Sequence, residues 1–322
     1  MKKLFVISLI VLLLVASFSF SAVKYPTRTV TFICPWAAGG GTDRLTRFVA
    51  GKLQEYFGKP FVVVNKTGGS GAVGHNAGAM ARPDGYTITM ITFELATMHS
   101  MGLTHVTYKD FEPIIELNED AAAVIVRADA PWETVNDLLE DIKNNPGKYK
   151  FSGTAIGGTW DLARIGMLDA AGIPIEYTTW IPSKGAAPAL VELLGGHVDV
   201  VTCSLPEAVS QLEAGQLKAL AIMADERNPK FPDVPTLKEM GINWSAGTWR
   251  GVAVPKGTPK EIVDKLYDAL LEISKSDDFK DFMAKNGFGI KIRGPEEFKK
   301  FLAEQDETWK RILKIAGYLK EE

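Results

Sequence analysis

The chain has 322 residues, of which 46% are apolar, and it carries a formal net charge of −3. Loss of Lys2 and Lys3 with a cleaved leader takes that charge to −5. This acidic balance argues against nucleic acid as a partner, because binding to nucleic acid depends on clustered basic residues.

The first 22 residues have the pattern of a secretory signal peptide. Lys2 and Lys3 precede an apolar run from Leu4 to Phe20, and small residues follow that run. The run is about long enough to cross a membrane, so an uncleaved anchor is the alternative. The small residues favour cleavage. We therefore predict removal of residues 1–22 and a periplasmic, water-soluble mature protein.

Short strands and helices then alternate along the chain. The pattern predicts strands at Thr29–Cys34, Phe61–Asn65 and Thr87–Thr92, with a helix at Thr42–Phe57 between the first two. Later strands are predicted at Ala121–Arg127, Tyr149–Ser152, Ile175–Thr179, Val198–Cys203 and Gly251–Val254. Later helices are predicted around Val135–Ile142 and at Asp161–Ala171, Ala186–Leu194, Lys260–Ser274, Asp277–Asn286 and Pro295–Leu319. This alternation predicts an α/β protein with mixed sheets that carry helices on both faces.

About 300 residues remain after cleavage, which is more than one hydrophobic core usually serves, so two lobes with a cleft between them are expected. We assign residues 23–120 and 253–322 to the first lobe and residues 121–252 to the second. The strands near 121–127 and 250–254 are the expected crossings between the lobes.

The cysteines Cys34 and Cys203 both lie in apolar runs and have the pattern of small buried residues. Export would allow a disulfide between them, but the sequence cannot place their Cα atoms within bonding range. The question of a bridge therefore stays open.

The first glycine-rich turn, Gly39–Gly41, follows a strand and opens a helix. Glycines let a backbone approach a ligand closely, and the free N–H groups of a helix start favour an anion. Thr42 or Asp43 is placed to cap the helix. A tight turn without a ligand is the alternative, but three consecutive glycines exceed what a turn requires.

The second turn, Gly69–Gly74, matches the dinucleotide fingerprint G-x-G-x-x-G, and Glu94 follows it at the spacing of a ribose-binding acid. Against this alternative, the residues Lys66–Gly68 separate the turn from the preceding strand by more than a tight turn allows, and an exported chain lies away from nicotinamide cofactors. Ser70 lies one residue out of the G-x-S-x-G pattern of serine hydrolases, which would also need triad partners. We predict neither an enzyme nor a cofactor.

The third turn runs from Ser152 to Trp160 and again lies between a strand and a helix, as a counterpart of the first turn. Thr154 and Thr159 supply hydroxyl groups beside flexible backbone. Lys184, before a further helix, adds a candidate positive charge. The four histidines lack metal-ligand spacing, so no metal site is predicted.

The order of motifs along the mature chain resembles the solute receptors of tripartite tricarboxylate transporters, also called the Bug receptor family. The matching segments are Pro35–Asp43, Val64–Gly74, Pro83–Thr87, Lys184–Ala189, Leu194–Asp199, Phe231–Thr236 and Gly251–Pro255. Two features depart from the family: Ser183 stands where relatives usually carry a tyrosine, and the stretch Tyr177–Trp180 is unusual.

The resemblance implies the two-lobed periplasmic binding protein fold of type II topology. It also implies a small carboxylate ligand, such as a di- or tricarboxylate, and delivery of that ligand to a two-component integral membrane permease. The candidate ligand-binding residues are Trp36, Ala37, Ala38, Gly39, Gly40, Thr42, Asp43, Gly69, Ser70, Gly71, Thr92, Thr154, Gly157, Gly158, Thr159, Ser183, Lys184 and Cys203. We expect a monomer whose lobes close on the solute, with both helix starts offering unpaired amides. A periplasmic enzyme and a receptor for a signalling partner are the alternatives.

Overall fold

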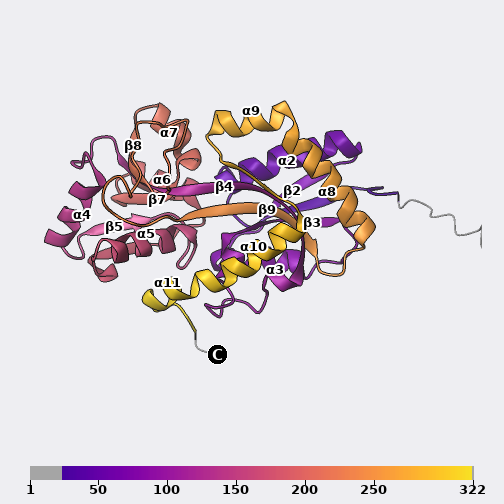
Figure 1. Ribbon diagram of the computed structural model, residues 1–322, viewed down its shortest axis with the longest axis horizontal. Coiled ribbons are helices and arrows are strands. Elements are labelled where there is room, and N and C mark those ends of the chain that lie inside the picture. The colour runs from indigo at the N-terminus through magenta and orange to yellow at the C-terminus, as the bar shows by residue number, and fades with distance from the viewer. Residues whose placement is uncertain (1–23, 321–322) are drawn as a thin grey trace, which may run out of the picture.

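The computed structural model describes residues 24–320, so the predicted signal peptide lies outside the described part. Two α/β halves lie side by side, and long strands run from one to the other (Figure 1). None of the helices within residues 24–320 is long and apolar enough to cross a membrane.

The first half contains the start of the described chain. Its elements are β1 (Val30–Cys34), α2 (Gly41–Phe57), β2 (Phe61–Asn65), α3 (Ala72–Ala79) and β3 (Thr87–Thr92). Parallel pairing places β1 between β2 and β3, with Val30 opposite Phe61 and Thr31 opposite Thr87. Its core is built from alternating strand residues such as Phe32 and from the inward face of α2, including Leu45.

The second half repeats this plan. Its elements are α4 (Val135–Asn144), β5 (Tyr149–Ser152), α5 (Thr159–Ala170), β6 (Thr178–Ile181), α6 (Ala186–Leu194), β7 (Val200–Ser204), α7 (Val209–Glu213) and β8 (Leu217–Ile222). Here β5 lies between β6 and β7 in parallel pairing. The element β5 therefore corresponds to β1, and the helix start after β5 corresponds to the helix start after β1.

Two long antiparallel strands join the halves: β4 (Phe111–Arg127) and β9 (Gly247–Pro255) (Figure 1). The strand order is β2-β1-β3-β9-β4 in the first half and β6-β5-β7-β4-β8 in the second. In both halves an antiparallel strand is inserted after the third strand, so the halves share one topology. The two predicted crossing strands lie within β4 and β9, and β4 starts ten residues earlier than the predicted strand.

The C-terminal part adds α8 (Lys260–Lys275), α9 (Asp277–Asn286), β10 (Ile290–Arg293), α10 (Pro295–Thr308) and α11 (Lys310–Ile315). The predicted single helix Pro295–Leu319 is broken at Trp309, which has φ −84° and ψ −9°. Its indole packs edge-on against Phe93 and Trp244, so tertiary packing overrides the helical pattern. Helix α11 reaches the second half, where Arg311 pairs with Asp169 on α5.

Several smaller elements differ from the predicted ones. Residues Ile175–Tyr177 form a 3₁₀ turn, and the strand β6 starts only at Thr178. The sequence pattern did not reveal β8, β10, α3 and α7, which are short or have weak periodicity. None of these differences moves the glycine-rich turns.

Candidate ligand-binding cleft

The two helix starts that follow β1 and β5 have the same backbone geometry. Gly40 is the N-cap of α2 with φ −73° and ψ 171°, and Gly158 is the N-cap of α5 with φ −75° and ψ 169°. Neither helix has a hydrogen bond from a capping side chain, although Thr42 or Asp43 was the predicted cap of the first. A glycine N-cap leaves the first amides of a helix accessible.

An aspartate in the first turn of each helix holds the glycine-rich turn in place. The Gly39 N–H donates to Asp43 at 2.9 Å, and the Gly157 N–H donates to Asp161 at 3.0 Å. Both glycines have positive φ, of 84° and 67°, which favours glycine over other residues. Because the same glycine–aspartate hydrogen bond occurs in both turns, we infer that Asp43 stabilises the conformation of the first turn.

The Asp43 carboxylate is stabilised in its charged form. Burial opposes its ionisation, but hydrogen bonds from Arg47, Gly39 and Asn65 outweigh burial and hold the pKa of Asp43 below its usual range. Asn65 also donates to the Trp36 carbonyl at 2.9 Å, so the end of β2 fixes the turn after β1.

The two helix starts line a common cavity of about 20 Å³ between the halves. Its lining residues are Trp36, Gly40, Gly41, Thr42, Glu94, Thr154, Thr159, Trp160, Ala186, Glu207, Thr248 and Arg250. Of the predicted residues, the cavity brings together Trp36, Gly40 and Thr42 with Thr154 and Thr159. The Thr154 hydroxyl is buried and has no hydrogen-bond partner, so it is available to a ligand.

A glutamate from each half reaches the helix start of the other half. Glu94, in the 3₁₀ turn after β3, accepts hydrogen bonds from the Thr159 N–H at 3.1 Å and the Thr159 hydroxyl at 2.7 Å. Glu207, in the 3₁₀ turn after β7, lies so close to Gly41 that a Cβ there would be 2.9 Å from its Cγ. The expectation of unpaired amides at both starts is therefore not met at Thr159.

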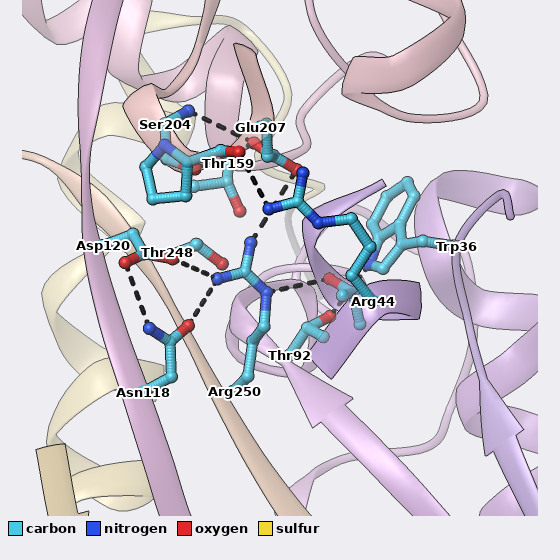
Figure 2. A network of polar contacts seen from close by, with 12 residues as sticks. Trp36, Arg44, Thr92, Asn118, Asp120, Thr159, Ser204, Glu207, Thr248 and Arg250 are labelled. Carbon is cyan, nitrogen blue, oxygen red and sulfur yellow. Dashed lines mark hydrogen bonds and ion pairs between the residues drawn. The ribbon is translucent and has the colours of Figure 1, made fainter. Parts of the chain in front are cut away.

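Arg250 organises the floor of the cavity (Figure 2). Its Nη1 donates to Asn118 and Asp120, both at 2.5 Å, and its Nε donates to the Thr42 hydroxyl at 2.9 Å. Its Nη2 lies 3.8 Å from Glu207. Burial raises the pKa of Glu207, against the attraction of Arg250 and hydrogen bonds from Ser204. The sequence pattern did not reveal Arg250 or Glu207 as site residues.

A second cavity, of about 230 Å³, opens beside the first and shares Trp36 with it. It is lined by Trp36, Gly68, Gly69, Ser70, Gly71, Ala155, Pro182, Ser183 and Lys184. The Ser70 hydroxyl donates to the Ile156 carbonyl at 2.8 Å, which joins the halves at this cavity. The glycine-rich turn with the dinucleotide pattern therefore contributes to the wall of the cleft.

The remaining predicted residues lie around these cavities without lining them. Thr92 is buried, accepts from the Trp36 indole at 3.1 Å and donates to Glu94 at 2.6 Å. Cys203 is buried in β7 as a free thiol, as is Cys34 in β1. The predicted residues that line neither cavity are Ala37, Ala38, Gly39, Asp43, Thr92, Gly157, Gly158 and Cys203. No group of residues suited to hold a metal ion occurs in the described part of the chain.

Two α/β halves of matching strand order, joined by crossing strands around a polar cleft, define a two-lobed binding protein. Solved structures agree with this class. The periplasmic binding protein BugD is 33% identical over 92% of this chain and 100% of that chain, with a TM-score of 0.86. R. palustris Rpa4515 with adipate is 29% identical over 91% and 98%, with a TM-score of 0.85. MatC from Rhodopseudomonas palustris with bound malate is 27% identical over 90% and 100%, with a TM-score of 0.84.

Residues 45–318 match the tripartite tricarboxylate transporter family receptor. The protein BugT of Bordetella pertussis is 30% identical over 302 residues, which are 92% of each chain. The chain belongs to the tripartite tricarboxylate transporter receptor family, as the order of its motifs predicted.

Proposed function

We propose that this protein is an exported receptor that captures a small carboxylate between its two lobes and delivers it to a two-component membrane permease. The start of α2, which lines the cavity between the halves, carries the proposal. Helix starts stabilise negative charge through free N–H groups and the helix dipole. Structural neighbours with adipate and with malate support a carboxylate as the solute.

Capture requires the lobes to separate. The cavity of about 20 Å³ has room for about one water molecule, so a carboxylate enters only when the halves move apart. The open form binds the solute at the turn Trp36–Thr42 of the first lobe. Closure then brings the Thr154 hydroxyl of the second lobe to the solute, whereas Thr159 meets Glu94 of the first lobe. Within the described residues 24–320, two crossing strands and the C-terminal helices connect the halves, which suits a hinge.

Hydrogen bonds alone give this site a marginal affinity. Each bond to a charged group contributes about 1.5–3 kcal/mol. Association costs about 4–15 kcal/mol, and micromolar binding needs about 8 kcal/mol. Burial of the solute's carbon skeleton, for example against Trp36 and Trp160, supplies part of the difference.

We further propose that the protein acts in the periplasm as a monomer and without turnover of its solute. Residues 1–22 direct export, and the domain boundaries at residues 120/121 and 252/253 separate the lobes on the crossing strands. Family members and neighbours are solute-binding proteins, which supports binding without chemistry.

Native mass spectrometry of the purified protein tests the proposal, followed by calorimetric titration with the acid that co-purifies. We expect one small acid per chain, micromolar or tighter binding, and a smaller radius of gyration in solution scattering with the acid bound. An acid that is chemically converted, or the absence of binding to any small carboxylate, would contradict the proposal.

A pair of isosteric variants locates the solute. Thr154→Val removes a buried hydroxyl that has no partner in the protein, so it should weaken binding by about tenfold at unchanged stability. Thr89→Val is the matched control, because the Thr89 hydroxyl is also buried and unpaired but lies against α3. Equal affinities of the two variants for the solute would show that the Thr154 hydroxyl does not contact the solute.

A further inference from the structure

Glu94 is a buried carboxylate that only neutral donors hold. Glu94 is 2% exposed. Its carboxylate accepts hydrogen bonds from the Thr92 hydroxyl and from the amide and hydroxyl groups of Thr159. Within residues 24–320, no lysine or arginine forms an ion pair with it. A buried charge without a paired cation is costly, so a cation placed beside it is stabilised.

The neighbouring histidine does not supply that cation. The Thr92 N–H donates to His75 Nε2 at 3.2 Å, so the ring proton lies on Nδ1, which donates to the Gly71 carbonyl at 2.9 Å. Burial is the main cause that lowers the pKa of His75, which therefore stays neutral. The charge of Glu94 thus remains uncompensated by the ring.

The arginine of the cavity is also committed to other carboxylates. Arg250 Nη1 pairs with Asp120 and its Nη2 lies nearest to Glu207. A second arginine, Arg44, lies near Glu207 and Asp120 and donates to the Pro206 carbonyl and to Asn286, so neither arginine pairs with Glu94. An acidic side chain that lacks a cation favours a ligand that brings positive charge as well as a carboxylate.

Glu94 also occupies the place where the second helix start would bind an anion. Its Oε1 accepts from both donors of Thr159 at the first residue of α5. A second ligand carboxylate at that start would meet a like charge in a buried site, where like charges repel strongly.

We infer that Glu94 sets the ligand class of this cleft: a solute with one carboxylate, which binds at the α2 start, and a positively charged nitrogen, which lies beside Glu94. This inference rests on the proposed function and narrows it from carboxylates in general to aminocarboxylates. Dicarboxylates of the same length are the disfavoured class. The unpaired Thr154 hydroxyl gives the nitrogen a neutral acceptor in the same cavity.

Matched pairs of probes test the inference on the mature chain. Each pair has the same alkyl spacer and differs in one end group: succinate with β-alanine, glutarate with 4-aminobutyrate, and adipate with 5-aminopentanoate. Calorimetric titration gives the ratio of the two affinities in each pair. The ratio that tests the inference is that of the pair containing the tightest-binding acid. We expect the amino acid to bind about tenfold more tightly than the dicarboxylate.

The variant Glu94→Gln keeps a hydrogen-bond acceptor for Thr159 and removes the charge. It should shift the ratio toward the dicarboxylate by about tenfold, whereas Glu94→Asp should keep the preference of the unmodified protein. Glu192→Gln, on the exposed side of α6, makes the same change in net charge outside the cleft and should leave the ratio unchanged. Thermal unfolding of each variant shows that it is folded.

The outcomes separate the two proposals. A dicarboxylate that binds more tightly than its amino partner in the unmodified protein, or a ratio that Glu94→Gln does not shift, overturns the inference while the carboxylate receptor stands. The absence of binding by all six acids would count against the proposed function itself, and the inference would fail with it.

Discussion

Arg250 Nη1 and Asp120 Oδ2 form an ion pair of 2.5 Å in which both side chains are almost fully buried, at 1% and 2% exposure. Arg250 lies on β9 and Asp120 on β4, so the pair joins the two strands that run between the lobes. The same guanidinium donates to Thr42 in the first helix start. One side chain therefore connects the hinge with the ligand-binding turn.

Replacement of this arginine should strongly destabilise the fold. Arg250→Leu leaves Asp120 buried without its cation, and loss of one partner of a buried pair costs about 3–5 kcal/mol. Urea unfolding measures the loss. The control is Arg311→Leu, which removes an exposed pair with Asp169 and should cost under about 1 kcal/mol. Similar losses in the two variants would show that burial does not matter for the Arg250 pair.

Addition of one methyl group at Gly41 should hinder closure of the lobes without unfolding the protein. Gly41→Ala places a Cβ 2.9 Å from Glu207 Cγ and 3.1 Å from Arg250 Nη2, and Glu207 comes from the other half. The backbone of Gly41 is not in the left-handed region, so alanine fits the helix itself. We expect a less closed form in solution scattering and a loss of affinity of about tenfold, with little change in thermal stability.

Gly51→Ala is the control on the same helix for this prediction. A Cβ at Gly51 meets nothing within 4 Å, so closure and binding should be unaffected. If Gly41→Ala closed and bound as well as Gly51→Ala, the contact between Glu207 and the first helix start would not form in the closed protein.

The pH dependence of stability should carry a contribution from Glu116. This residue is fully buried on β4 beside Arg293, and burial, which outweighs the arginine, raises the pKa of Glu116 from 4.5 to about 8. The folded state thus holds a proton that the unfolded state releases, so this contribution is complete below about pH 4.5 and is lost as pH rises to about 8.

Glu116→Gln isolates that contribution, because glutamine keeps the shape and does not titrate. Urea unfolding at pH 5 and pH 9 should show a smaller drop in the free energy of unfolding for the variant than for the unmodified protein. Parallel pH profiles of the two proteins would mean that Glu116 keeps an ordinary pKa in the folded state.

The two cysteines should be unreactive thiols in the folded protein. Both Cys34 and Cys203 are fully buried, and burial raises the pKa of Cys34 to about 11 and that of Cys203 well above its ordinary value. Thiolate is the reactive form, so iodoacetamide should label neither residue until urea unfolds the chain. Labelling of either cysteine in the folded protein would contradict the burial of these thiols. Failure of both cysteines to react after unfolding would show that they are not free thiols.

Local patterns explain which parts of the fold were predictable. Strand β2, Phe61–Asn65, has the predicted bounds because polar and glycine residues frame a β-branched run. The helix starts after β1 and β5 were also predictable, since Gly39–Gly41 and Gly157–Gly158 interrupt the pattern between strand and helix. Short β8 and β10 have no such frame and form through pairing with the distant strand β4.

The contacts that form the site join residues far apart in the sequence, so the local sequence pattern did not predict them. Glu94 lies 65 residues from its partner Thr159, and Arg250 lies 208 residues from Thr42. The one local signal is a polar residue soon after the carboxyl end of a parallel strand, where ligands of α/β proteins bind. Glu94 follows β3 and Glu207 follows β7 in this way. Its position after a strand also made Glu94 a candidate ribose-binding acid in the sequence analysis. In the structure Glu94 lines the cavity between the halves.

A crystal structure of the mature protein with the tightest-binding acid of the probe panel would show directly where the solute binds. We expect the solute carboxylate at the α2 start beside Gly40–Thr42, with Thr154 and Glu94 at the other end of the solute and the lobes closed around it. A solute bound outside this cleft, with the α2 start covered by Glu207 alone, would contradict this expectation.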